Sequence, residues 1–186
     1  AMTYFRGGEY NKQRSYINKA MATCKKEKTP ESTKLQISLL SDLGGYYLQK
    51  GNAQKGLDMY NQYVLETVKA YGELHTMTAS AYMNLAIAYA QTNDFSSSEV
   101  KFRKSIEIKT QLYGKYHPDV ALSYGNLVIL LNLMQRYEDA LQASQNSFIA
   151  NCLGYTNEDC YVDLVPVVRQ YKLLDPVNVC LLYTSD

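Results

Sequence analysis

One stretch of this chain occurs twice, and that duplication constrains the fold more than any other feature. Tyr71–Asn84 reads YGELHTMTASAYMN and Tyr113–Asn126 reads YGKYHPDVALSYGN, so matched positions lie 42 residues apart. A fixed period of this size is typical of a supersecondary unit that is copied and stacked. The chain is therefore expected to be a repeat protein.

Each copy holds two apolar-periodic segments that are separated by a polar break. The period aligns Leu43, Leu85 and Leu127 in the first segment, and the breaks read QKGN, QTND and LMQR. Apolar residues at intervals of three and four predict an amphipathic helix for every segment. Because one such pair cannot cover its own apolar surface, the copies must stack.

The positions of glycine and proline residues set the expected helix boundaries. Gly72 and Gly114 lie where a helix commonly ends on a left-handed residue, and Pro118 with Asp119 suits the start of the next helix. Gly44, inside a helix, is expected at a close crossing of two helices. The predicted helices cover 9–27, 31–49, 53–70, 76–92, 95–112, 118–134, 137–152 and 158–173.

The expected organisation is one all-α array of about eight helices. Within residues 1–173 it comprises a partial repeat 1–30, full repeats 31–74, 75–116 and 117–156, and a partial repeat 157–173; a tail, 174–186, follows. Cys180–Asp186 resembles the translation of a sequencing-library adapter and is left out of fold reasoning. We expect the chain to begin inside a repeat and to be truncated at its C-terminal end, with the partner of the last predicted helix in unread sequence.

Composition argues against several classes of partner. The 186 residues carry a net charge of +1, so no global charge favours nucleic acid or a membrane surface. The longest uninterrupted run of leucine, isoleucine and valine, Leu127–Leu131, is far too short to span a membrane. Four cysteines are too sparse for a disulfide framework. We expect a cytoplasmic protein, with cytoskeletal association as an alternative.

No arrangement of residues predicts catalysis. His75 and His117 are the only histidines and lie 42 residues apart at matching corners, so a structural role is favoured over metal binding. The sequence has no nucleophile elbow, phosphate-binding glycine loop or zincin motif. We therefore expect no enzyme activity, no cofactor, no metal and no small-molecule substrate.

The eighteen tyrosines are explained mainly by packing. Tyrosines could also stack nucleobases beside the N-terminal lysines, but the outward-facing positions do not repeat as they do in an RNA-reading array, so nucleic acid is not expected. The tyrosines assigned to core positions are Tyr47, Tyr82, Tyr89, Tyr124, Tyr137 and Tyr171.

The period, together with the pattern YG-x-x-HPDVA-x-x-x-x-N-L at Tyr113–Leu127, resembles the tetratricopeptide repeat (TPR), and more specifically its long-repeat subfamily typified by kinesin light chains and nephrocystin-type scaffolds. The resemblance covers nearly all of residues 1–173. It implies a superhelical solenoid of antiparallel helix pairs whose first helices line a concave groove. The sequence departs from the family where Gly56, Ser98 and Ser105 replace alanines.

The resemblance also implies a peptide site in that groove. Asn84 and Asn126 stand where related proteins clamp the backbone of a bound peptide, although a structural role is equally open for both. Asp42 holds the same place in the first full repeat, where solvated exposure is the simpler interpretation. Gly125 leaves room for a bound chain or relieves crowding. The other expected groove residues are Met83, Ile87, Gln91, Ile129 and Leu133.

These observations favour a scaffold or adaptor that binds a protein or peptide partner in its groove, as kinesin light chains do. An alternative is a regulatory or oligomerising appendage of a larger signalling enzyme or ATPase, with the groove filled by its own chain. A third is a ciliary or cytoskeletal structural component.

Overall fold

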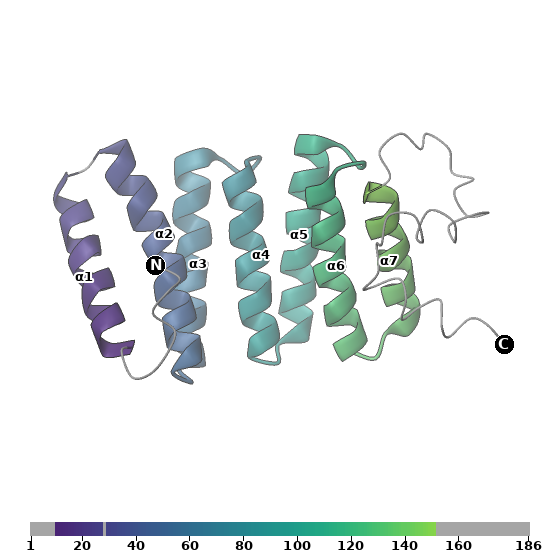
Figure 1. Ribbon diagram of the computed structural model, residues 1–186, viewed down its shortest axis with the longest axis horizontal. Helices are drawn as coiled ribbons and strands as arrows, with labels where there is room; N and C mark the ends of the chain where they lie inside the picture. Colours follow the sequence, from purple (N-terminus) through teal and green to yellow (C-terminus); the bar gives the residue numbers. More distant parts are fainter. Residues whose placement is uncertain (1–9, 28, 152–186) are drawn as a thin grey trace. The chain divides into compact units, whose positions relative to one another are not determined.

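The computed structural model describes residues 10–27 and 29–151, and this part of the chain is all helix and short turns (Figure 1). The predicted all-α fold is confirmed. Seven helices are present in the described ranges: α1 (Tyr10–Glu27), α2 (Pro30–Gln49), α3 (Ala53–Tyr71), α4 (Thr76–Gln91), α5 (Phe95–Tyr113), α6 (Pro118–Leu133) and α7 (Tyr137–Asn151).

Every one of these helices begins and ends within one residue of the predicted boundary. The predicted helix 158–173 and the tail 174–186 lie outside the described residues, and the predicted repeat boundaries stay predictions. The chain divides within α5, between Lys101 and Phe102, into two compact units that are described separately below.

The first unit is built from helices packed in sequence order. Helix α1 packs on α2, α2 on α3, and α3 on α4, while α2 also contacts α4 (Figure 1). Leu43 belongs to a smaller cluster with residues of α1, including Ile17 and Cys24. The main buried cluster consists of Ile37, Leu40, Tyr63, Val64, Ala81 and Leu85.

Glycine lets α2 and α3 approach closely. A Cβ atom on Gly44 would lie 2.7 Å from the ring of Tyr60, and one on Gly56 would lie 2.6 Å from Leu48 Cδ2. The predicted close crossing at Gly44 is therefore confirmed. The residues 42 positions later meet in a comparable way, since the Ser98 hydroxyl donates a hydrogen bond of 2.8 Å to the Ala86 carbonyl oxygen.

In the second unit, α6 packs against α7. Leu127, Leu130 and Leu131 of α6 are fully buried. The Ser147 hydroxyl on α7 donates a hydrogen bond of 2.9 Å to the Ala121 carbonyl oxygen on α6. Apolar packing and this polar contact together hold the two helices side by side.

The turns repeat the 42-residue period in their backbone geometry. Gly51, Asn93 and Gln135 all adopt positive φ, at 73°, 62° and 58°, in the short turns within the helix pairs. Gly72 and Gly114 adopt positive φ as predicted. The turn keeps positive φ even where another residue replaces glycine. Asparagine tolerates this left-handed conformation better than glutamine does.

Tyrosine packing follows the prediction with one exception. Tyr47, Tyr82, Tyr89 and Tyr124 are partly buried against the core clusters. Tyr137, in contrast, is 66% exposed, so its assignment to the core was wrong. It is the first residue of α7, and because helical side chains tilt toward the N-terminus, its ring extends beyond the end of its own helix. Tyr171 lies outside the described residues.

Candidate functional site

The two histidines cap helices, as their corner positions suggested. His75 Nδ1 accepts a hydrogen bond of 3.1 Å from the Met77 backbone N–H, and His117 Nδ1 accepts one of the same length from Asp119. Each imidazole also stacks on the tyrosine four residues earlier, with ring centroids 4.8 Å and 4.4 Å apart. Both histidines therefore have a structural role at the start of a helix.

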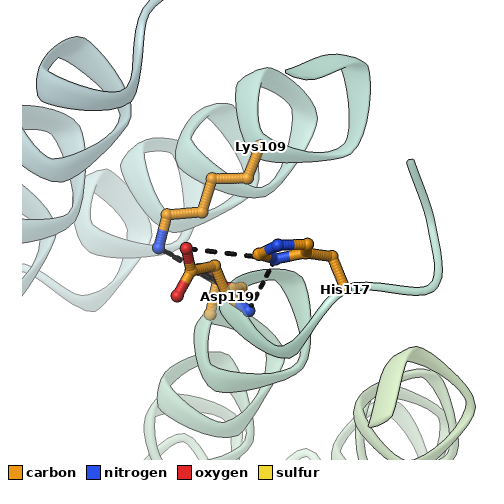
Figure 2. A network of polar contacts seen from close by, with 4 residues as sticks. Lys109, His117 and Asp119 are labelled. Atoms are coloured by element: carbon orange, nitrogen blue, oxygen red, sulfur yellow. Dashed lines mark hydrogen bonds and ion pairs between the residues drawn. The ribbon is translucent and has the colours of Figure 1, made fainter. Parts of the chain in front are cut away.

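Beside His117 lies a polar network that the sequence analysis missed (Figure 2). Lys109 extends from α5 to the first two turns of α6, where Nζ donates to Ser123 Oγ at 2.9 Å and to the Asp119 carbonyl oxygen at 3.4 Å. The Asp119 carboxylate lies 3.9 Å from His117 Nδ1. Lys109 is only 6% exposed, which is rare for a lysine.

Comparing the copies would have revealed this network. The residues 42 positions before Lys109, Asp119 and Ser123 are Thr67, Met77 and Ala81, so all three positions are more polar in the later copy. Burial lowers the pKa of Lys109, and the nearby Asp119 carboxylate partly opposes that shift. The buried amine of Lys109 thus links α5 to α6 through hydrogen bonds to Ser123 and to the Asp119 carbonyl oxygen.

Replacing Lys109 with methionine is expected to leave the free energy of unfolding at pH 7 unchanged or raised by about 1 kcal/mol. Burying an amine carries a desolvation penalty that a well-packed apolar side chain avoids, and Ser123 Oγ keeps its 2.8 Å hydrogen bond to the Asp119 carbonyl oxygen. Urea denaturation measures the change. A loss of more than about 2 kcal/mol would show instead that the amine is a net source of stability.

The same pair of proteins should differ in pH dependence. Because burial lowers the pKa of folded Lys109, the unfolded chain binds more protons between that pKa and the ordinary value of 10.5. Stability therefore rises with pH across this interval in the parent, relative to Lys109→Met. Equal slopes of the free energy of unfolding against pH in the two proteins would contradict the shifted pKa of Lys109.

The described part of the chain has neither a metal-binding cluster nor a membrane-spanning helix. No three histidine, cysteine, aspartate or glutamate side chains gather there in a way that could hold a metal ion. None of the described helices combines the length and apolarity needed to cross a membrane.

The predicted groove residues lie along one stripe of each first helix, at the same register. The stripe of α6 carries Leu122, Ile129 and Leu133, which are 61%, 62% and 59% exposed. On α4, Ile87 is 38% exposed, Gln91 is exposed and Met83 is half-buried. Asn84 and Asn126 are half-buried on their helices, and Asp42 is exposed on α2.

The chemistry of this stripe changes from one copy to the next. Matched positions carry polar or small residues on α2, a mixture on α4 and mostly apolar residues on α6. Asp42 is one of the polar residues on α2. Partial burial of its carboxyl group raises its pKa. The matched sets are Ser38, Asp42, Gly45 and Gln49; Ser80, Asn84, Ile87 and Gln91; and Leu122, Asn126, Ile129 and Leu133.

The structure assigns these residues to separate units. Asp42 and Asn84 belong to the first unit, in which α2 contacts α4, and Asn126 belongs to the second unit. That the three residues line one groove stays a prediction.

Among solved structures, this fold resembles repeat proteins of the kinesin light chain type. BtubC (BKLC) from P. vanneervenii superposes with a TM-score of 0.67 at 20% identity, covering 81% of this chain and 60% of that one. A Podosopora anserina protein named as a kinesin light chain, with nearly identical TPR-like repeats, gives a TM-score of 0.53 at 14% identity and covers 76% of each chain.

Among curated sequences, the chain is similar to clustered mitochondria protein homologs. The protein from Ajellomyces capsulatus is 24% identical over 113 residues, which is 60% of this chain and 9% of that protein. The homolog from Xenopus tropicalis is 26% identical over 101 residues, which is 54% of this chain and 8% of that protein. The chain thus spans under a tenth of the length of these relatives.

Residues 35–111 match the tetratricopeptide repeat family model, which describes a repeat domain rather than a catalytic one. This range runs from α2 into α5 and includes the first copy of the duplicated stretch. The match, the all-α pairing of helices and the structural neighbours agree with one another. Residues 35–111 thus form a tetratricopeptide-repeat region.

Proposed function

We propose that this chain is a protein-interaction module that binds segments of partner proteins on the exposed faces of α2, α4 and α6. The observation that supports the proposal best is the stripe on α6, where Leu122, Ile129 and Leu133 are each about 60% exposed. Single exposed apolar residues are common, but several that are aligned on one helix face form a patch of the kind that marks an interaction surface.

Asparagines at matched positions are proposed to anchor the bound segment. A primary amide offers two donors and an acceptor, so it can bond both backbone groups of a peptide. Asn84 and Asn126 are half-buried at the centre of the stripes on α4 and α6. Each therefore has neighbours that restrict its side chain and a part that solvent reaches.

The specific version of this function is an adaptor similar to a kinesin light chain, and its support is the likeness of fold. A second candidate is an interaction or regulatory appendage within a much larger protein. The curated relatives favour that alternative, because the matched segment is under a tenth of their length. In both versions the helix faces bind another polypeptide segment.

Peptide selection on the immobilised chain tests the proposal. Replacing Asn84 and Asn126 with alanine together should weaken the selected peptides by about tenfold or more, which is about 1.4 kcal/mol. Asn61→Ala on α3 is the matched control, because Asn61 is exposed and lies on the other type of helix. Fluorescence polarisation measures the affinities, and undiminished binding by the double variant would exclude the anchoring role.

A further inference from the structure

Both histidine corners depend on an imidazole whose Nδ1 carries no proton. His75 Nδ1 accepts a hydrogen bond from the Met77 backbone N–H, and His117 Nδ1 accepts one from the Asp119 N–H, each at 3.1 Å. Proton uptake converts Nδ1 into a donor that faces another donor, and it places a positive charge at the positive end of the helix dipole. Imidazole commonly takes up its proton between about pH 5 and 8. Mild acid is therefore expected to remove these two helix caps.

The cap of α2 has no group that titrates in this range. Thr29 Oγ1 accepts a hydrogen bond of 3.1 Å from the Ser32 N–H, and Ser32 Oγ accepts one of 2.9 Å from the Thr29 N–H. Hydroxyl groups keep their donor and acceptor roles between neutral and mildly acidic pH. The start of α2 is thus an internal reference for the two histidine corners.

The second residue of each helix distinguishes the two histidine corners. In α6, Asp119 Oδ2 lies 3.9 Å from His117 Nδ1, so a protonated imidazole has a carboxylate with which to pair (Figure 2). The matched residue of α4 is Met77, which carries no charge. A proton on His117 therefore exchanges a hydrogen bond for an ion pair, whereas a proton on His75 breaks the cap without this replacement.

Lys109 fastens the α6 corner independently of the imidazole. Its Nζ donates to Ser123 Oγ at 2.9 Å and to the Asp119 carbonyl oxygen at 3.4 Å (Figure 2). These bonds do not involve His117, so they keep the first two turns of α6 attached to α5 when the imidazole is protonated. The other charged residues near this helix are Lys115, whose Nζ lies over the Tyr116 ring; Glu107, which pairs with Lys104 at 3.3 Å; and Glu138 and Asp139, which follow the far end of α6 in the first turn of α7.

The carboxylates nearest to His75 in the sequence already bond to other side chains. Glu73 accepts a hydrogen bond of 3.3 Å from the Tyr82 hydroxyl, and Glu66 pairs with Lys69 at 2.9 Å. Helix α4 itself has no charged residue. The charged residues on the neighbouring helices are Lys101 of α5, whose Nζ lies over the Tyr82 ring, and Glu31 and Lys34 of α2, which are exposed.

One bond limits how far α4 can open. Thr78 Oγ1 donates a hydrogen bond of 2.6 Å to the Gly72 carbonyl oxygen, which ties the third residue of α4 to the end of α3. The Tyr71 ring is stacked on His75 at 4.8 Å and attracts a protonated imidazole as well. Loss of the cap is therefore expected to free the first residues of α4 without detaching the helix.

We propose that the corner between α3 and α4 is a pH-sensitive switch built into the fold. Proton uptake by His75 opens the first turn of α4, while the corresponding turn of α6 stays closed. The switch uses only groups of this chain, and it does not rest on the binding function proposed above.

Solvent exchange of backbone amide protons, measured by NMR on the full chain at about pH 8 and about pH 5, tests this proposal. Each rate is divided by the rate of an unstructured peptide at the same pH, which gives the protection of that amide. Protection of the Met77 N–H should fall about fivefold in acid, the factor expected for a lost cap, and that of the Asp119 N–H less than about twofold. The Ser32 N–H of α2 should not respond.

Exchanging the second residues of the two helices is the decisive variation. Met77→Asp should reduce the acid response of that amide to less than about twofold, and Asp119→Met should raise the response of its amide to about fivefold. Each substitution introduces a residue type that the matched corner already carries. His75→Asn, which keeps a capping side chain that cannot be protonated, should abolish the response in α4.

Four results would overturn the proposal. Constant protection of the Met77 N–H would show that its cap survives acid. Equal losses at Met77 and Asp119 in the parent, a comparison that needs no variant to fold, would show that the second residue does not distinguish the corners. A response that persists in His75→Asn would assign the proton to another group. Loss of protection along the whole of α4 would indicate that the helix unfolds instead of opening at its first turn.

Discussion

Leu85→Ala is expected to lower the free energy of unfolding by about 3–5 kcal/mol, the range found for large cavities in a buried core. Leu85 is 1% exposed and lies in the main cluster of the first unit with Leu40 and Tyr63. Truncation removes apolar contacts on α4 that α2 and α3 provide, and helices cannot easily close the gap. Urea denaturation followed by circular dichroism measures the loss.

The control for that experiment is Ile87→Ala, two residues further along the same helix. Because Ile87 is partly exposed, its truncation should cost about 1 kcal/mol or less. Similar losses in the two variants would contradict the inward orientation of Leu85 that the repeat pattern predicts.

Gly44→Ala and Gly45→Ala should change stability in opposite directions although the residues are neighbours on α2. A Cβ on Gly44 would lie 2.7 Å from the Tyr60 ring, whereas the nearest atom to one on Gly45 is the Tyr60 hydroxyl oxygen at 3.5 Å. Gly44→Ala forces the ring to move and is expected to destabilise by about 1–3 kcal/mol. Gly45→Ala is expected to stabilise by up to about 1 kcal/mol through helix propensity.

Thermal denaturation of the two single variants measures both shifts. Gly125→Ala provides a second control, since its new methyl group would meet no described atom within 4 Å. If Gly44→Ala were as stable as Gly45→Ala, the close crossing of α2 and α3 would not determine the choice of glycine.

The sequence alone predicted the helices because their ends are marked by residues with strong local preferences. Gly72 and Gly114 end a helix through positive φ, and Pro118 begins one. Because the copies share one period, a helix end that is clearly marked in one copy also predicts the matching end in another copy where the local signal is weak. Local geometry and periodicity were sufficient for this level of structure.

Long-range packing was less predictable. Lysine is usually exposed, so nothing local to Lys109 indicated that its amine would be buried against Ser123. Tyr137 was assigned to the core from its position in the repeat, yet a residue at the first position of a helix has little to pack against. Both outcomes depend on neighbours that are distant in sequence or absent.

The sequence could predict which positions of each helix face outward, but not the shape of the surface that they form. The period placed Asn84, Ile87 and Ile129 on outward-facing positions, and the structure leaves part of each accessible. Gly125 was foreseen only as room for a ligand or relief of crowding. A Cβ built on Gly125 would meet no facing atom of the described residues within 4 Å, so relief of crowding does not explain this glycine.

The buried amine of Lys109 is also expected to affect which helices associate while the chain folds. Copies this similar could dock in the wrong order, with α4 replacing α6 against the C-terminal half of α5. In such a mispaired intermediate Lys109 would face Met77 and Ala81 instead of Asp119 and Ser123, and its charge would lose water without gaining the Ser123 acceptor. We expect this penalty to favour the correct order of these similar helices during folding.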